Sequence, residues 1–231
     1  MTPITGLAVA LDTVSVDEAS DWATAVAPHA ELIKLGLEFY LRNGATGVAA
    51  VRESAPDCGL FLDLKLHDIP ATVAGGARAV AALEPAVLTV HASGGADMVA
   101  AAATELPKTA IAAVTVLTSL SAEDLAELGL PDSEKLVPLW AATAVAAGAK
   151  AIVSSAQEVG ALRSVLGPEV SLITPGIRPA GTSSNDQSRV ATPQRAIEAG
   201  ANVLVVGRPI TQSPDPERAA AAVAAEIKGA Q

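Results

Sequence analysis

An alternating run of charged residues lies in one apolar segment of the chain. Asp63 and Lys65 are separated by one leucine in the sequence Phe-Leu-Asp-Leu-Lys-Leu-His-Asp, and Asp68 follows shortly after them. Side chains two residues apart on a β-strand point to the same face, so Asp63 and Lys65 are expected to share one face. Lys34 lies in a second apolar run, Leu-Ile-Lys-Leu-Gly, which we expect to form the neighbouring strand. The spacing predicts one array of these four charges.

Such an array suits proton-transfer chemistry. Burying a lysine or a carboxylate is costly unless the charges pair, and paired carboxylates hold a lysine protonated in a site from which water is largely excluded. A lysine held in this way can act as a general acid. A structural network of ion pairs is the alternative, but four such charges in a chain with only 15 Lys and Arg residues favour the catalytic interpretation.

Glycine and arginine residues further along the chain predict a site for an anion. Gly176, Gly207 and Arg208 follow two late apolar runs, and barrel enzymes commonly bind phosphate at such positions through backbone N–H groups. The Arg208 guanidinium can add two parallel, charge-assisted hydrogen bonds to such an anion. Arg178 and Gln187 lie on the adjoining polar loop, which we expect to close over a bound phosphate.

Eight short apolar runs have the length and composition of buried strands, and most intervals between them carry an alanine-rich helical pattern. Strands alternating with helices predict a parallel sheet, and eight of them predict a single-domain (β/α)8 barrel, an α/β fold whose chemistry lies at the C-terminal ends of the strands. An open, doubly wound sheet is the alternative. The open sheet is disfavoured because it usually has a glycine-rich motif after its first strand. Here Asp12 and Thr13 stand at the end of the first run instead. The runs are 7–11, 32–36, 60–65, 86–91, 111–117, 151–154, 170–174 and 202–206.

The sequence predicts where several helices begin. Ser15 and Glu18 predict a capping box for the first helix, and Pro216 is typical of the first turn of the last one. Residues 118–135 form the longest insertion. They are expected to hold a short helix opened by Ser121 and to make a lid or rim on one face of the barrel.

Composition excludes several classes of protein. Half of the chain is hydrophobic and its net charge is −10, which excludes disorder and disfavours nucleic-acid binding, and Cys58 is the single cysteine. The longest uncharged stretches, 109–122 and 136–149, have 14 residues each, too few for a membrane-spanning helix of about 20 residues. No basic region precedes Lys34, so we expect no signal peptide and no membrane partner. We expect a cytoplasmic protein with one domain over residues 1–231.

The chain resembles the orotidine 5'-monophosphate decarboxylase family over essentially its whole length. The charged segment followed by Ile69 and Pro70, with Pro-Gly-Ile-Arg and Gly-Arg-Pro-Ile later in the chain, carries the resemblance. One departure is Ala71, where the family more often has asparagine. The matching segments are ALD (10–12), IKLG (33–36), FLDLKLHDIPAT (61–72), VHASGG (90–95), VTVLTS (114–119), TPGIRP (174–179), DQSRVATP (186–193) and VVGRPI (205–210).

This resemblance implies a carboxy-lyase that converts orotidine 5'-monophosphate to uridine 5'-monophosphate, the last step of UMP biosynthesis, without a metal or other cofactor. Lys65 would donate the proton that replaces the departing CO2, and Asp63 would lie against the substrate carboxylate. Asp12 and Lys34 would hold the ribose hydroxyls. The remaining substrate-binding positions that the resemblance implies are Ile69, Thr118, Pro175, Arg178, Gln187, Gly207 and Arg208. It also implies a homodimer with shared active sites, in which Asp68 and Thr72 reach into the site of the other subunit.

Two other functions remain open from the sequence. A metal-dependent sugar-phosphate decarboxylase or aldolase of the same superfamily shares the Asp-x-Lys-x-x-Asp pattern, although it resembles this chain less after Asp68. A non-catalytic barrel that binds a phosphate ligand is the other alternative. His67 and His91 are interpreted as structural, and no spacing resembles a zinc site.

Overall fold

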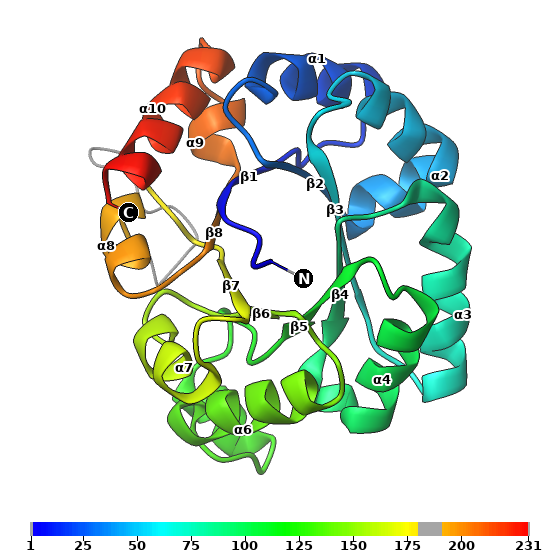
Figure 1. The fold of residues 1–231 in the computed structure, drawn as a ribbon, viewed down its shortest axis with the longest axis vertical. Coiled ribbons are helices and arrows are strands. Elements are labelled where there is room, and N and C mark those ends of the chain that lie inside the picture. Colours follow the sequence, from blue (N-terminus) through cyan, green and yellow to red (C-terminus); the bar gives the residue numbers. More distant parts are fainter. Residues whose placement is uncertain (1, 180–190, 231) are drawn as a thin grey trace.

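Parallel strands close into a barrel in the computed structural model, which describes residues 2–179 and 191–230 (Figure 1). Each strand pairs with the next, and β8 pairs with β1 to close the ring. The closed ring confirms the predicted (β/α)8 barrel and excludes the open sheet. The strands found in these residues are β1 (Gly6–Ala10), β2 (Leu32–Gly36), β3 (Gly59–Leu66), β4 (Val87–His91), β5 (Ala110–Val114), β6 (Ala151–Val153), β7 (Ser171–Thr174) and β8 (Val203–Val206).

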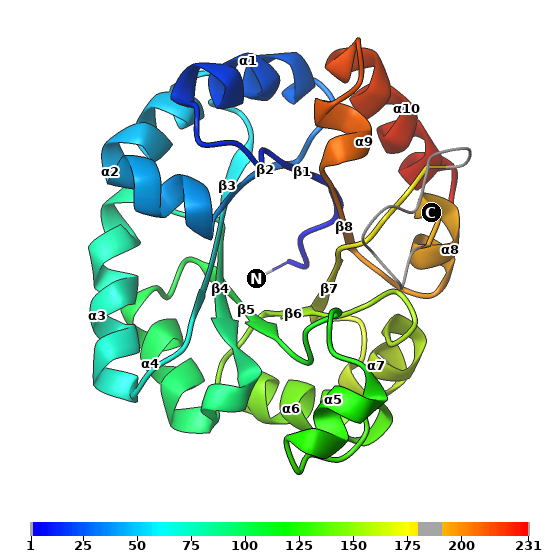
Figure 2. The same ribbon diagram turned by 180° about the vertical axis from the view of Figure 1, so that it is seen from behind.

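Helices surround the barrel in both views along its axis (Figures 1 and 2). None of the helices in the described ranges is both long and apolar enough to cross a membrane. The α-helices are α1 (Val16–Val26), α2 (Leu37–Glu53), α3 (Pro70–Val80), α4 (Ala96–Glu105), α5 (Ala122–Glu127), α6 (Ser133–Ala146), α7 (Val159–Leu166), α8 (Pro193–Glu198), α9 (Arg208–Thr211) and α10 (Pro216–Gly229), and two 3-10 turns are η1 (Ala81–Leu83) and η2 (Ala92–Gly94).

The apolar core has two layers because side chains alternate along each strand. The larger layer lies between the strands and the helices and includes Leu62, Leu88 and Leu204. The smaller layer fills the inside of the barrel, where Phe61 and Leu32 pack among small side chains. Alanine therefore serves inside the barrel as well as in the helices. The inner alanines are Ala8, Ala110, Ala112 and Ala151.

The predicted strands are all present, and their ends differ by a few residues. The largest difference is at β5, which was expected over 111–117 and ends at Val114. Val114 is the last residue of β5 that pairs with either neighbour, because β4 ends at His91 and β6 ends at Val153. Thr115 still donates to the carbonyl of Val153, and the chain beyond it leads to the predicted insertion.

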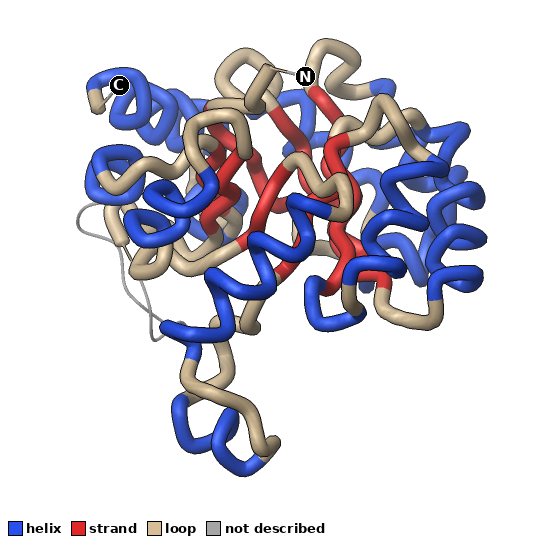
Figure 3. The backbone as a smooth tube through the Cα atoms, turned by 60° about the horizontal axis from the view of Figure 1, so that its bottom comes forward, coloured by secondary structure: helices blue, strands red, loops and turns tan. Residues whose placement is uncertain are grey.

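The helix caps follow the sequence with one correction. The Ser15 side chain accepts the N–H of Glu18, as predicted, but the Glu18 carboxylate accepts the hydroxyl of Thr13 in place of the reciprocal bond of a capping box. A full capping box is found instead at Ser121, which opens α5. Figure 3 shows that α5 and its flanking loops stand away from the barrel.

Barrel closure depends on buried leucines such as Leu204, which is fully buried on β8 between β1 and β7. We expect Leu204→Ala to lower the free energy of unfolding by about 2–5 kcal/mol, because the lost side chain leaves a cavity. Urea denaturation measures this loss. Leu128→Ala is the matched control: that side chain is 64% exposed at the end of α5, so a change below about 0.5 kcal/mol is expected. Equal losses in the two variants would contradict this picture of the core.

Candidate active site

Three strand ends bring charged side chains together at the C-terminal mouth of the barrel. Lys34 Nζ lies 3.2 Å from Asp12 Oδ1 and 3.5 Å from Asp63 Oδ2. Lys65 Nζ lies 2.7 Å from Asp63 Oδ1. Asp63 is therefore held between two lysines, one on each carboxylate oxygen. The structure thus joins Lys34, Asp63 and Lys65 as the sequence predicts, with Asp12 added beyond Lys34.

Burial strengthens the contact between Lys34 and Asp63 most, because both side chains are largely removed from water. The exposed fraction of the side chain is 10% for Lys34, 15% for Asp63 and 38% for Lys65. Burial raises the pKa of the Asp63 carboxyl, but the charges of Lys34 and Lys65, with hydrogen bonds from Lys65 and Thr89, outweigh it and bring the pKa below its ordinary value of 3.8. Asp63 is therefore an anion at neutral pH, and it provides a fixed negative charge for the two lysines.

The backbone that carries Lys65 is irregular. Leu62 pairs with Leu88 of β4, and Leu66 pairs with Val90, so β3 advances four residues where β4 advances two. Lys65 lies inside this irregular segment with φ of +49°, a left-handed conformation that is uncommon for a residue with a Cβ. Non-glycine residues in such conformations occur often at functional sites, where the surroundings hold them.

A cavity of about 260 Å³ opens beside the charged group. Strand ends from around the barrel contribute to its lining, which combines apolar walls with charged and polar groups. This composition is typical of a site for a small polar ligand. Its lining includes Asp12, Lys34, Phe61, Asp63, Lys65, Thr118, Pro175, Gly176, Arg178, Gly207 and Arg208.

One side of this cavity has the features expected of an anion site. Gly176 has φ of +77°, a conformation that favours glycine. Gly207 caps α9, which begins at Arg208, and a Cβ at this glycine would lie 3.4 Å from the Cβ of Ala10. The Arg178 side chain is buried to 9% exposure and donates from Nη1 to the carbonyl of Ile177. Two arginines and two glycines thus line the same cavity as Lys65.

Three of the predicted site residues do not join this cavity within the chain. Asp68, Ile69 and Thr72 are exposed, and the Asp68 carboxylate accepts the N–H of Ile69. The predicted four-charge array is therefore not formed within a single chain, because Asp68 makes no ion pair with Lys34 or Lys65 and does not line the cavity. Gln187 lies outside the described residues.

Thr89 is a site residue that the sequence interpretation missed. It is buried on β4, and its hydroxyl donates to Asp63 Oδ1 at 3.0 Å and accepts the N–H of Lys65 at 2.8 Å. The available signal was a polar residue in the run Val-Leu-Thr-Val-His, two positions from Val87 and from His91. Period two places these three on the inner face of the barrel.

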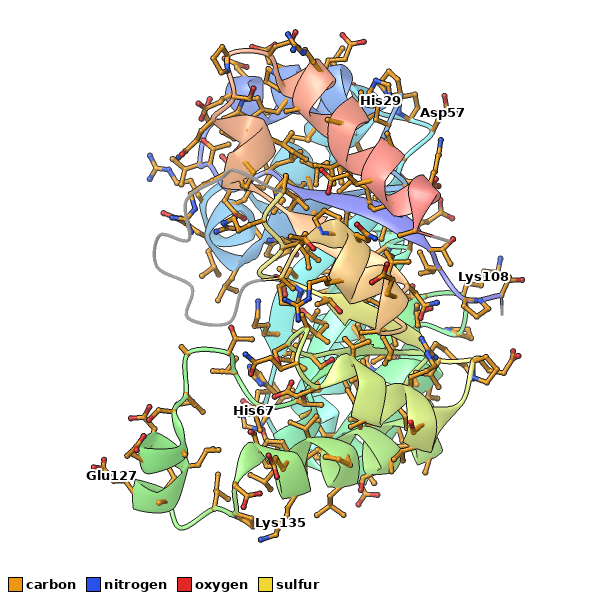
Figure 4. The ribbon with its side chains drawn as sticks, turned by 90° about the vertical axis from the view of Figure 1, so that its left-hand side faces the viewer. His29, Asp57, His67, Lys108, Glu127 and Lys135 are labelled. Atoms are coloured by element: carbon orange, nitrogen blue, oxygen red, sulfur yellow. The ribbon has the colours of Figure 1, made fainter. Side chains whose placement is uncertain are left out.

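The two histidines near the mouth form a pair. The ring centroids of His67 and His91 are 5.3 Å apart, and the His67 ring lies 3.4 Å from the Ser93 hydroxyl. His67 is exposed rather than packed in the core, on the side of the molecule from which α5 projects (Figure 4). Burial lowers the pKa of His91, and the charges of His67 and Lys65 lower it further.

No group of three or more His, Cys, Asp or Glu residues suited to a metal ion occurs in the part of the chain that the structure describes. The acidic groups at the mouth, Asp12 and Asp63, instead face lysine ammonium groups. The polar chemistry of the described cavity is that of fixed lysine, aspartate and arginine charges.

The fold and these charges define a (β/α)8 barrel with a Lys-Asp-Lys group at the C-terminal ends of its strands, beside a cavity that Arg178 and Arg208 also line. The chain belongs to the family described as "Orotidine 5'-phosphate decarboxylase / HUMPS family", whose model matches residues 5–223.

Named relatives cover nearly the whole chain. An "Orotidine 5'-phosphate decarboxylase" of Thermobifida fusca (strain YX) is 59% identical over 223 residues, covering 96% of this chain and 95% of the relative. One from Anaeromyxobacter sp. (strain K) is 50% identical and covers 98% of this chain and 100% of the relative. The crystal structure of the Lactobacillus acidophilus enzyme of the same name superposes with a TM-score of 0.84 at 33% identity, covering 98% and 99% of the two chains.

The lowered pKa of Asp63 predicts how stability depends on pH. Folding favours the ionised carboxylate, so its stabilising contribution is present above the ordinary pKa of 3.8 and is lost as pH falls through the lower folded value. Asp63→Asn lacks this titration. We therefore expect the free energy of unfolding of the wild type, minus that of Asp63→Asn, to be constant from about pH 5 to 7 and to decrease below about pH 4. Urea denaturation across this range measures it, and a difference that grows on acidification would contradict the assignment.

Proposed function

We propose that this chain converts orotidine 5'-monophosphate to uridine 5'-monophosphate and CO2, with Lys65 as the acid that protonates C6 of the pyrimidine. One observation carries the proposal: Lys65 Nζ is held 2.7 Å from Asp63 Oδ1 at the edge of a cavity that also contains Arg178 and Arg208. The names of relatives that are up to 59% identical support this substrate.

The reaction balances without a cofactor. The bond between C6 and the carboxylate carbon breaks, CO2 leaves, and the electron pair remains on C6. A proton from Lys65 Nζ then forms the new C6–H bond, and the neutral amine regains a proton from solvent. No electron acceptor is consumed, so a positioned ammonium group is sufficient for the proton transfer.

Fixed charge is the proposed source of rate acceleration. The Lys65 ammonium interacts more strongly with C6 as negative charge develops there, and such preorganised interactions stabilise a transition state. Asp63 keeps this ammonium in place and, in the proposal, lies against the substrate carboxylate, where repulsion between the two anions favours loss of CO2.

The other charged and polar positions are assigned to substrate binding. Asp12 and Lys34, which contact each other at 3.2 Å, are assigned to the ribose hydroxyls. Thr118 and Pro175 line the cavity and are assigned to the pyrimidine end of the site. The phosphate is remote from the bond that breaks, and its binding energy can support the chemical step. Residues assigned to the phosphate are Arg178, Gln187, Gly207 and Arg208.

We also propose that the active site is completed by a second copy of the chain. A second cavity of about 210 Å³ lies beside the first, where it is bordered by Lys34 and Lys65. Asp68, Ile69 and Thr72 are exposed on the loop and helix start after β3, with Ile69 66% exposed. A homodimer that inserts this segment into the partner's second cavity would bury the exposed isoleucine and place a carboxylate near the lysines.

The proposal extends to organisation and location. We propose that residues 1–231 act as one domain, which the closure of the barrel between β1 and β8 supports. We place the enzyme in the cytoplasm as a nucleotide biosynthetic enzyme, and its single cysteine, Cys58, suits a reducing compartment.

Turnover of orotidine 5'-monophosphate by the pure protein, followed by ultraviolet absorbance in the presence of EDTA, tests the function. Lys65→Ala is expected to lower kcat by at least about 1000-fold, because it removes both the acid and the cation. Lys135→Ala is the matched control: its side chain is 77% exposed on α6, and unchanged turnover is expected.

Three outcomes would overturn the proposed function. Substantial turnover by Lys65→Ala would remove lysine from its role as the acid. Activity that EDTA abolishes and Mg2+ restores would favour a metal-dependent sugar-phosphate enzyme, and tight nucleotide binding without release of CO2 would favour a non-catalytic barrel.

Complementation tests the shared site. Asp68→Ala and Lys65→Ala chains are each expected to be inactive, but a heterodimer of the two contains one site with both native residues. Random assembly of equal amounts makes half of the dimers heterodimers, so about one quarter of wild-type activity is expected. Native mass spectrometry verifies that heterodimers form. No recovery of activity in verified heterodimers would place Asp68 outside the partner's site.

A further inference from the structure

Thr89 lies on β4 next to Asp63 and Lys65 of the charged group. Its side chain belongs to the inward face of β4 and the residue is 1% exposed. The Thr89 hydroxyl lies 3.0 Å from Asp63 Oδ1 and 2.8 Å from the backbone nitrogen of Lys65. One side chain on β4 therefore contacts both members of the Asp63–Lys65 pair on β3.

The directions of these hydrogen bonds are determined by their partners. A backbone N–H can only donate, so the Thr89 oxygen accepts from Lys65. An ionised carboxylate can only accept, so the single hydroxyl proton of Thr89 points to Asp63 Oδ1. Lys65 Nζ donates to the same oxygen at 2.7 Å. Oδ1 thus receives two donors, while Oδ2 lies 3.5 Å from Lys34 Nζ.

The contact with the Lys65 backbone falls where the ladder of β3 and β4 is interrupted. Between the pairs Leu62 with Leu88 and Leu66 with Val90, the register shifts. Lys65 has its positive φ within this interval, and its N–H donates to a Thr89 side-chain oxygen. The hydroxyl therefore satisfies a backbone group at the position where the conformation of Lys65 is least favourable.

Thr89 itself makes no contact that would bind substrate. It does not line either of the two cavities at the mouth, as far as the described residues define them. A loss of its hydroxyl should consequently act on the reacting groups rather than on substrate affinity.

We propose that Thr89 is a positioning residue, whose one hydroxyl holds the Asp63 carboxylate and the Lys65 backbone together so that the lysine ammonium stays at the reacting carbon. This role in the reaction rests on the proposed function of Lys65. An ordinary buried hydroxyl that contributes only to stability is the competing explanation.

Three variants separate these explanations. Thr89→Val keeps the shape and removes the hydroxyl, whereas Thr89→Ser keeps the hydroxyl. Thr109→Val is the matched control, because Thr109 is also buried and donates to the carbonyl of Pro85 at 2.8 Å, at the start of β5 and away from the mouth. Circular dichroism verifies the fold of each variant, and Thr89→Ala replaces Thr89→Val if the valine variant does not fold.

We expect Thr89→Val to lower kcat about 10- to 100-fold, the loss associated with a hydrogen bond to a charged group, with KM changed by less than about threefold. Thr89→Ser should stay within about threefold of the wild-type kcat, and Thr109→Val should leave kcat unchanged. Amide hydrogen exchange at Lys65 gives a readout that needs no turnover. It should be faster in Thr89→Val and close to wild type in Thr89→Ser.

Wild-type kcat in Thr89→Val would overturn the proposal. So would an equal loss in Thr89→Ser, which retains the hydroxyl, or in Thr109→Val. If the wild type does not turn over orotidine 5'-monophosphate, the proposed function fails separately. Exchange at Lys65 then still decides whether Thr89 holds this backbone: faster exchange in Thr89→Val supports the contact, and unchanged exchange overturns it.

Discussion

The Asp63 carboxylate between two lysines is the interaction around which the mouth of the barrel is built. Removing three charges from water is costly, and their mutual attraction offsets that cost only where the geometry is held closely. Three successive strand ends supply the geometry: Lys34 comes from β2, and Asp63 and Lys65 come from β3, with Asp12 just after β1. The parallel barrel places these ends at one face, where the Asp63 carboxylate lies between the two lysine side chains.

Holding Lys65 in place requires an irregular backbone. A regular β3 would continue its ladder with β4, but here the register shifts and Lys65 takes a positive φ. Thr89 lies opposite this interval and contacts both the backbone of Lys65 and the carboxylate of Asp63. Backbone strain and buried charge therefore occur at the same few residues. The pairing of the other strands in the closed barrel and the two apolar layers provide the stability that offsets their cost.

The distribution of charge over the molecule also follows from this arrangement. The chain has a net charge of −10, which by itself favours solubility and disfavours an anionic ligand. Four of its 15 cations, Lys34, Lys65, Arg178 and Arg208, nevertheless line one cavity. Local charge at the mouth, rather than the net charge, determines which ligand the cavity attracts. Asp68, Ile69 and Thr72 are exposed outside this cavity.

The sequence by itself determined the eight alternating strand and helix units, the shared face of Asp63 and Lys65, and the arginine side of the cavity. The spacing of apolar residues, and the Gly, Pro and Ser residues at the ends of helices and strands, encode these features over short stretches of sequence. Tertiary structure decided the rest. The early end of β5 depends on where β4 and β6 end, and the exposure of Asp68 depends on the loop after β3. The Thr89 contacts depend on a register shift between two strands. Each of these is set by pairing between residues far apart in the chain, which no local pattern records.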